Sequence, residues 1–326
     1  MSLSTLAQIK KKVRRLTASP STNQLSESDL EEYVDTFYEL DFPSHLKIWN
    51  LYDTLEFFTQ ANEDRYSFDT DLYHAVNPPV YIDGNQSFYS QSREEFFGIY
   101  PKRSTQQTGP AGDGSAGPYS FTLSSTPVLK RQVTVSAIDS TGSTQSASDV
   151  ADSPTSATGT WIDNTTGLAL AGAINYVTGV CTITWTNTID STETLTIRSS
   201  PYQASRPAGM LFFKDYFILR PVPDKVYHVV VNVYRKPSQL LSASDHSDSN
   251  EPNVKQWWQY IAFGAAIKVL QDRQDLESIQ NIVPFFKEQE ALILYRTATQ
   301  LAPERTATIY TDQMANPVGN RAFGGQ

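Results

Sequence analysis

The sequence predicts an α+β protein. We expect a discontinuous α-helical bundle domain with a small antiparallel sheet, an inserted all-β sandwich domain, and an extended C-terminal tail. Apolar residues recur at helical spacing near both ends of the chain, and the middle is rich in serine and threonine with strand-like alternation. The last residues lose any period. We therefore place the helical domain at residues 1–110 and 201–301, the sandwich at 111–200 and the tail at 302–326.

Length and composition limit the classes of function. The chain has 326 residues and a formal net charge of -9, which suits about two domains and argues against general coating of nucleic acid. With one cysteine and four scattered histidines, neither a disulfide framework nor a metal site is expected. No apolar run is long enough for a membrane span, the N-terminus lacks a secretory signal, and nothing suggests a cofactor.

The N-terminal region is predicted to be helical at first. Residues 28–31 have the Ser-x-x-Glu pattern of a capping box and predict the start of a second helix. Pro43 predicts the end of that helix and the start of a third, which runs to Tyr52. The first helix follows from four apolar residues spaced 3, 4 and 3, which are Leu6, Ile9, Val13 and Leu16.

Strands are predicted in the rest of this region. Aromatic runs at 55–58 and 66–68 flank a polar turn and predict a hairpin. Val80–Ile82 followed by Asp83-Gly84-Asn85 predicts a strand and a tight turn. Residues 92–100 have the pattern of a short capped helix.

The middle region predicts a sandwich of short strands. Of the 80 residues from Ser120 to Ser199, 30 are Ser or Thr. Cys181, Ile183 and Trp185 alternate with threonines, as in a half-buried strand. Residues 109–117 are predicted to be a flexible connector, and 175–179 a turn. The predicted strands are 119–123, 131–138, 167–170, 173–176, 181–186 and 193–197.

The third region returns to helices. The apolar runs 210–219 and 226–234 predict an antiparallel hairpin. A helix should begin at residues 250–252, because Pro252 fits a first helical turn. Its apolar face includes Trp257, Trp258 and Tyr260, which we interpret as core rather than as a ligand platform. Two more helices are predicted at 276–282 and from Pro284 to Leu301.

No motif forms a convincing catalytic or cofactor site, so a non-enzymatic role is expected. Residues 112–117 match G-x-G-x-x-G by letter, but the following segment is extended instead of helical. Ser115 has part of a nucleophile motif without the strand–turn–helix context. The acidic residues Asp29, Glu31, Glu32, Glu94 and Glu95 suit first helical turns, and Asp245, His246, Asp248 and Glu251 suit a solvated loop.

One dense basic run lies on the first predicted helix. It comprises Lys10, Lys11, Lys12, Arg14 and Arg15. A solvated helix face is the plain interpretation. The alternatives are that this face meets DNA or a neighbouring subunit.

Three stretches together resemble the head-to-tail adaptor (connector, head completion) proteins of tailed bacteriophages. The first is Leu6 to Leu46, which contains LEEYVDTFY and Asp41-Phe42-Pro43. The second is FILRPVPDKVY, which starts at Phe217 and continues to Pro237. The third is the Trp257 to Leu270 helix with its small residues. The resemblance covers the regions on both sides of the serine- and threonine-rich segment.

The resemblance implies a structural virion protein of the neck, made and assembled in the host cytoplasm. Such proteins form a ring, usually of twelve copies, that joins the portal to the tail and continues the DNA channel. The implied partners are other copies, the portal, a tail or nozzle protein, passing genomic DNA and, through the β-domain, tail fibres, but no membrane. The C-terminal tail would reach the portal. Its candidate contact residues are Thr306, Ile309, Tyr310, Arg321 and Phe323.

Two other classes of function stay open at this point. One is a minor tail or baseplate protein whose β-domain docks fibres or binds host glycans. The other is a glycan hydrolase that uses carboxylates such as Asp163 and Asp190, which would have to lie at a defined separation.

Overall fold

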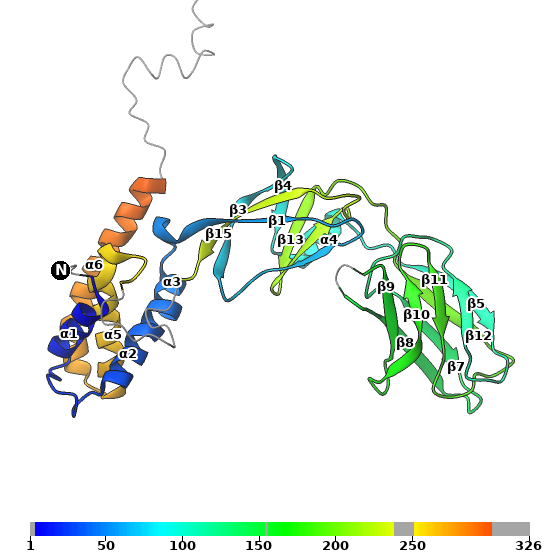
Figure 1. Ribbon diagram of the computed structural model, residues 1–326, viewed down its shortest axis with the longest axis horizontal. Coiled ribbons are helices and arrows are strands. Elements are labelled where there is room, and N and C mark those ends of the chain that lie inside the picture. Colours follow the sequence, from blue (N-terminus) through cyan, green and yellow to red (C-terminus); the bar gives the residue numbers. More distant parts are fainter. Residues whose placement is uncertain (1–3, 154–155, 238–250, 302–326) are drawn as a thin grey trace, which may run out of the picture. The chain divides into compact units, whose positions relative to one another are not determined.

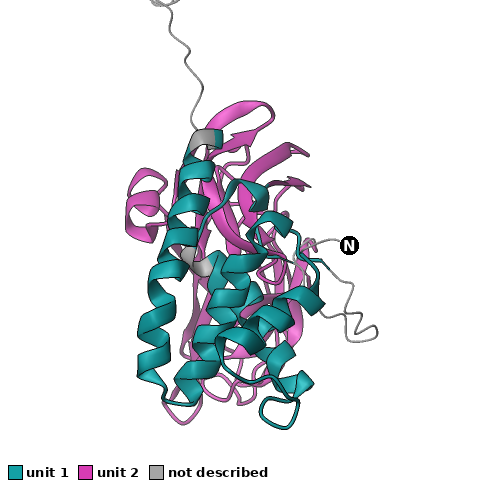
Figure 2. Ribbon diagram, turned by 90° about the vertical axis from the view of Figure 1, so that its left-hand side faces the viewer, with its two compact units in different colours: residues 1–52, 235–326 teal, residues 53–234 magenta. Residues whose placement is uncertain are grey.

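A computed structural model describes residues 4–153, 156–237 and 251–301. The chain divides into two compact units (Figure 2). Residues 1–52 and 235–326 form the first, which we call the helical unit, and residues 53–234 form the second, which we call the sheet unit. The boundaries predicted from the sequence lie near residues 110 and 200 instead. The flanking segments 53–110 and 201–234 lie in the sheet unit, because their apolar residues build a sheet with a core of its own.

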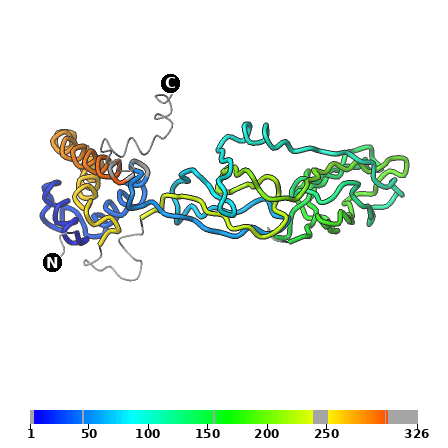
Figure 3. Tube along the Cα trace, turned by 90° about the horizontal axis from the view of Figure 1, so that it is seen from above, coloured from blue at the N-terminus to red at the C-terminus, as the bar shows by residue number. Residues whose placement is uncertain are grey.

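The helical unit packs around α5 (Trp258–Asp272). Helices α1 (Leu6–Leu16), α2 (Glu27–Thr36) and α6 (Leu276–Leu301) all contact it, so segments from both ends of the chain lie side by side (Figures 1 and 3). The packing is tight at Gly264. A Cβ atom there would lie 2.1 Å from the Phe37 ring, so glycine allows the close approach.

The N-terminal half of the helical unit contains one confirmed helix and two corrections. The predicted stripe on α1 is buried at Leu6, Ile9 and Val13. Helix α2 starts two residues earlier than the capping-box pattern indicated, because the Ser26 side chain accepts from the Asp29 amide at 3.0 Å. The predicted third helix begins near Pro43 as expected, but the prediction that it runs to Tyr52 is wrong. A π-helical turn (Phe37–Asp41), the four-residue α3 (Phe42–His45) and a 3-10 turn (Trp49–Leu51) occupy this stretch.

The C-terminal half also differs from prediction. A 3-10 turn (Lys255–Trp257) precedes α5, which therefore begins at Trp258 and not at residues 250–252. Helix α6 is continuous through Pro284, where two helices were predicted. A proline removes one helical hydrogen bond, and neighbouring turns can maintain the helix when a long face is packed. No helix in the described part of the chain is long and apolar enough to cross a membrane.

The first sheet of the sheet unit has seven strands in the order β1-β15-β3-β4-β13-β14-β2. Its two edge strands approach each other where they end. The ring centroids of Phe57 on β1 and Tyr66 on β2 are 5.2 Å apart. Helix α4 (Arg93–Ile99) packs against β4 and β13. The strands are β1 (Tyr52–Phe58), β2 (Arg65–Ser67), β3 (Tyr73–Ile82), β4 (Asn85–Ser90), β13 (Gly209–Phe213), β14 (Tyr216–Arg220) and β15 (His228–Arg235).

The strand pairings in this sheet correct two predicted hairpins. β1 and β2 exist, but they lie at opposite edges of the sheet order and do not pair. β14 pairs with β13 through a turn at Lys214-Asp215, whereas the prediction paired residues 210–219 with 226–234. The predicted turn after β3 is confirmed, with positive φ at Asp83 and Gly84. The short capped helix is confirmed as α4, where the Ser92 hydroxyl accepts from the Glu95 amide.

The second sheet has eight strands in the order β5-β12-β7-β8-β9-β10-β11-β6. Its core holds Trp161, Cys181, Ile183 and Trp185, which confirms the alternation seen in the sequence. The strands are β5 (Thr105–Ala111), β6 (Tyr119–Thr122), β7 (Thr134–Ile138), β8 (Thr144–Ala151), β9 (Thr158–Asp163), β10 (Ala169–Asn175), β11 (Val180–Ile183) and β12 (Thr194–Ser199).

Several local predictions for this sheet need correction. β5, β8 and β9 were not predicted. The segments 167–170 and 173–176 belong largely to one strand, β10, which carries an irregularity in its pairing with β9. The stretch 109–117 is no flexible connector, since it begins in β5 and its later amides bond to the chain around Ile189 and Glu193. The turn at 175–179 is confirmed.

A glutamine joins the two edge strands of the eight-stranded sheet. The Gln107 side chain on β5 donates to the Thr122 carbonyl of β6 at 3.0 Å. Its amide oxygen accepts from the Ser124 backbone N–H at 2.6 Å. One side-chain amide therefore supplies a donor and an acceptor where backbone pairing between β5 and β6 would otherwise be needed.

Candidate functional site

The junction between the two sheets of the sheet unit brings together buried charges. It is built on the loop between β1 and β2, residues 59–64. Backbone bonds hold this loop, because the amides of Thr59 and Asn62 donate to the carbonyls of Tyr227 and Pro223 at 2.9 and 2.8 Å. The loop is thereby a fixed platform that presents Glu63 and Asp64.

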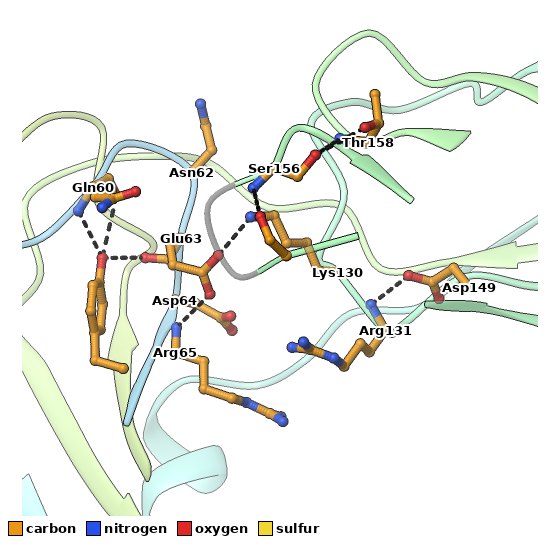
Figure 4. A network of polar contacts seen from close by, with 12 residues as sticks. Gln60, Asn62, Glu63, Asp64, Arg65, Lys130, Arg131, Asp149, Ser156 and Thr158 are labelled. Carbon is orange, nitrogen blue, oxygen red and sulfur yellow. Dashed lines mark hydrogen bonds and ion pairs between the residues drawn. The ribbon is translucent and has the colours of Figure 1, made fainter. Parts of the chain in front are cut away.

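Glu63 forms a buried ion pair across the junction. Its Oε2 lies 2.6 Å from the Nζ of Lys130, and the two side chains are 3% and 7% exposed (Figure 4). Burial raises the pKa of Glu63, and the hydrogen bond from Lys130 opposes that rise. Two desolvated charges depend on each other here, so removing one would leave the other poorly compensated.

Lys130 is placed by a turn that Asp149 organises. The Asp149 carboxylate on β8 accepts from the Val133 amide at 2.7 Å and from the Arg131 amide. Arg131 has a positive φ of 60°, which this anchor stabilises. Burial raises the pKa of Asp149, and these amides oppose the rise. The eight-stranded sheet thus aims Lys130 at the loop that carries Glu63.

A second pair and a neutral bond extend the junction. Asp64 Oδ2 lies 2.6 Å from the guanidinium of Arg220, the last residue of β14. The Tyr202 hydroxyl donates to Asn62 Oδ1 at 3.0 Å. The segment 200–202 also bonds to 127–129 through the backbone, because Leu129 and Tyr202 donate to Ser200 and Pro127.

Two cavities flank this charged layer. The smaller, ≈ 320 Å³, is lined by residues that include Phe58, Glu63 and Arg65. The larger, ≈ 650 Å³, has walls from the end of α4, the link to β5, the eight-stranded sheet and the end of β14. Its lining includes Tyr100, Lys102, Arg103, Leu129, Tyr202 and Arg220.

The basic run, interpreted from the sequence as a solvated helix face or else as a face that meets DNA or a neighbour, is largely used inside the helical unit. Lys10 is buried and pairs with Glu31 and Glu27. Arg14 pairs with Glu27 at 2.7 Å and donates to three backbone carbonyls.

The other three basic side chains of that run differ. Lys12 lies over the Phe263 ring at 4.1 Å and donates to Gln259, and burial lowers its pKa. Lys11 and Arg15 are exposed. These two are the most exposed members of the run.

The glycine-rich stretch at 112–117 is an ordered loop. Asp113 accepts from the Ser115 hydroxyl at 2.7 Å and the Tyr119 hydroxyl at 2.6 Å, which lower its pKa to about 2. No helix follows it, since Tyr119–Thr122 is strand β6. Ser115 is therefore part of a turn network.

The two carboxylates considered for glycan hydrolysis are turn-forming groups. Asp163 accepts from the Thr165 amide at 2.7 Å, and Asp190 from the Thr192 amide at 2.8 Å. These bonds lower the pKa of both carboxyls. Both carboxylates therefore have a structural contact within their own turns.

Other predicted residues have structural contacts or lie outside the described residues. Glu31 binds Lys10, and Glu95 accepts from the Ser90 hydroxyl at 2.9 Å. Trp257 and Tyr260 are buried, as predicted for core, whereas Trp258 is half-buried. No group of metal-binding side chains occurs within residues 4–153, 156–237 and 251–301. The predicted portal contacts Thr306, Ile309, Tyr310, Arg321 and Phe323, and the loop residues Asp245, His246 and Asp248, lie outside the described ranges.

Helix α6 leaves a row of large apolar side chains in solvent. Phe285, Leu292 and Tyr295 are 58%, 49% and 75% exposed. Their spacing of seven and three residues puts them on one face of the helix. A cavity of ≈ 490 Å³ on this helix is lined by Leu292, Tyr295, Trp257, Arg296 and Gln300. We call Phe285, Leu292 and Tyr295 the α6 face.

Comparison with known proteins gives only weak structural likeness. No family model matches the chain, and no curated protein matches it. Among solved structures, VP17, a capsid protein of bacteriophage P23-77, is similar with a TM-score of 0.21 and 14% identity. The match covers 57% of this chain and 87% of that one. A likeness at this level carries no argument about function.

Sequence reasoning missed both the junction and the α6 face. Glu63 and Lys130 are 67 positions apart, and neither belongs to a motif. Tyr295 and Leu292 lie in a helix that was predicted, but the sequence did not show which side of that helix is buried. The one available signal was the number of large apolar residues in 276–301, which exceeds what a single stripe requires.

Proposed function

We propose that this protein is a structural component of a bacteriophage virion and that it acts as a head-to-tail adaptor. In this proposal, copies form a ring, usually of twelve, that joins the portal to the tail and continues the DNA channel. The role is structural and not enzymatic. The acidic total of the chain fits a channel lining that does not grip phosphate.

The α6 face is the observation that carries the proposal. Exposed apolar rows on a soluble protein mark surfaces that bind other proteins. Phe285 and Tyr295 contribute two aromatic rings, the residue type most enriched at interface centres. A ring is built from repeated heterologous contacts, in which one such face meets a different surface of the next copy. The proposed position between portal and tail comes from the resemblance of the flanking sequence regions to adaptors.

Electron microscopy of the protein mixed with its phage's portal ring tests the proposal directly. We expect a ring of extra density on the portal and a copy number that matches the portal symmetry or a simple multiple. A trimer without portal binding would instead favour the minor tail or baseplate alternative. Monomeric protein beside free portal would contradict the adaptor role.

Paired variants test the contribution of the α6 face. Leu292→Glu should abolish ring formation, because a charge at the centre of an apolar contact is desolvated without compensation. Lys287→Glu, an exposed change on the same helix, is the matched control and should leave the ring intact. Circular dichroism should show both variants folded.

Deletion of residues 302–326 tests the proposed portal contact. We expect the truncated protein to stay folded and to form rings, but to lose binding to the portal. Retained portal binding by the truncated protein would show that another surface makes this contact.

A further inference from the structure

The larger junction cavity combines positive charge with apolar walls. We infer that this cavity is a docking site for an extended, acidic segment of a partner protein, whose carboxylates bind Lys102, Arg103 and Arg220. This inference is independent of ring formation, since none of these residues lies on the α6 face.

The charge of the cavity is unbalanced. Three cationic side chains line it, and no carboxylate does. Arg220 is paired with Asp64, which is not among the lining residues, whereas within the described residues no ion pair involves Lys102 or Arg103. Partial burial lowers the pKa of Lys102, repulsion from Arg220, Arg93 and Arg65 adds to this effect, and the carboxylate of Asp64 opposes it. An incoming carboxylate would relieve that repulsion.

The cavity is also preorganised. Arg220 is only 8% exposed, and it is fixed by Asp64 and by its bond to the Leu219 carbonyl at 2.9 Å. The Lys102 ammonium lies 4.6 Å from the centre of the Phe97 ring. The Tyr100 ring covers Gly209, where a Cβ atom would lie 2.6 Å from the ring. Cations held in place before binding lose little entropy when a ligand arrives.

The walls favour a peptide over other anions. Tyrosine and proline side chains form much of the lining, with Leu129 and Val222 beside them. Aromatic and proline-rich walls suit an extended peptide, whose side chains need apolar contacts between their charged groups. Inorganic phosphate would leave these walls unused.

The arrangement fits nucleic acid poorly. A nucleic acid backbone carries regularly repeated phosphates, and proteins bind it with a row or patch of cations. Here three cations converge on one recess of ≈ 650 Å³, in a chain of net charge -9. A carboxylate-bearing segment needs only a local cluster of this kind.

Isothermal titration calorimetry on the full-length protein tests the inference. The probe is the blocked peptide acetyl-Glu-Leu-Glu-Leu-amide, and its uncharged match is acetyl-Gln-Leu-Gln-Leu-amide. We expect saturable binding of the acidic peptide alone. Lys102→Gln should weaken it by about tenfold or more, because a charge-assisted contact is lost. Lys102→Arg should keep most of the affinity.

Arg198→Gln is the matched control. Arg198 is an exposed cation on β12 outside the cavity lining, so its loss should leave peptide affinity unchanged. The inference would be overturned by equal binding to wild type and Lys102→Gln, by equal binding of the uncharged peptide, or by no saturation at millimolar peptide. Binding of inorganic phosphate or a short single-stranded DNA that depends on Lys102, without peptide binding, would also overturn it.

Discussion

The helical unit and the eight-stranded sheet differ in where they keep large apolar side chains. On α6, two aromatic residues and a leucine share one exposed face. The eight-stranded sheet buries Tyr119, Trp161, Tyr176 and Trp185, and the large apolar residues that it exposes are aliphatic, such as Leu168 and Val180. The sheet therefore completes its own core, while the helical unit presents apolar surface that a neighbour can cover.

The largest effect should come from the buried charge pair that anchors the eight-stranded sheet at the junction. Glu63→Gln should destabilise the sheet unit by about 3 kcal/mol, because Lys130 stays buried without the charge of Glu63. Glu63→Gln combined with Lys130→Met should recover most of this loss. Urea denaturation gives the energies, and hydrogen exchange at residues 59–66 locates the change. Equal loss in the single and double variants would show that the charges are not what matters there.

The tight core of the helical unit should give the next largest effect. Gly264→Ala forces a Cβ atom into the Phe37 ring and should destabilise this unit by about 2 kcal/mol. Gly98→Ala on α4 is the control, since no atom lies within 4 Å of its added methyl group. That variant should be neutral or slightly more stable, because alanine favours helix. Thermal unfolding by circular dichroism would separate the two, and matching curves would contradict the packing argument.

A smaller, pH-dependent effect should come from the turn at Asp139 in the eight-stranded sheet. Its carboxylate accepts from the Thr141 hydroxyl at 2.6 Å and the Ser143 amide at 2.9 Å, which lower its pKa to about 2. The stabilising contribution is thus complete above the ordinary aspartate pKa near 3.8. It is lost as the pH falls toward about 2.

Comparing wild type with Asp139→Asn isolates this group from other carboxyls. The difference in unfolding midpoint should shrink as the pH is lowered through that window. A difference that stays constant with pH would mean that Asp139 titrates normally in the folded protein.

The smallest effect on stability should come from the α6 face itself. Tyr295→Ser should change the unfolding free energy of the isolated chain by no more than about 0.5 kcal/mol, because three quarters of the side chain is already in solvent. In the proposed ring the same change should weaken assembly, which sedimentation would measure. A large loss of stability would mean that the face belongs to the core.

Local patterns predicted the elements better than their partners. The spacing of Leu6, Ile9 and Val13 identifies α1, because a helix shows its buried side within a few residues. Alternation identifies β11 as a strand, and an apolar run identifies β15, but neither pattern carries information about which strand lies alongside. β15 therefore lies beside β1 and β3 rather than in the predicted hairpin with residues 210–219.

The candidate junction was beyond sequence reasoning for a related reason. A buried ion pair is defined by two residues that the fold brings together, and Glu63 and Lys130 look like ordinary surface residues in the sequence. Pro284 shows the converse case, in which a local sequence signal is present but the fold overrides it. It is a strong local signal for a helix end, yet α6 continues through it because packing on α5 outweighs one missing hydrogen bond.

The glutamine that spans β5 and β6 has a consequence for a sheet that lies close to other protein molecules. Open strand edges invite strands of other molecules, and many identical copies held together would raise that danger. Gln107 occupies Thr122 and Ser124 of the facing edge with its own amide. In the proposed ring, where copies lie close together, this contact would keep the seam between β5 and β6 from pairing with a strand of a neighbouring copy.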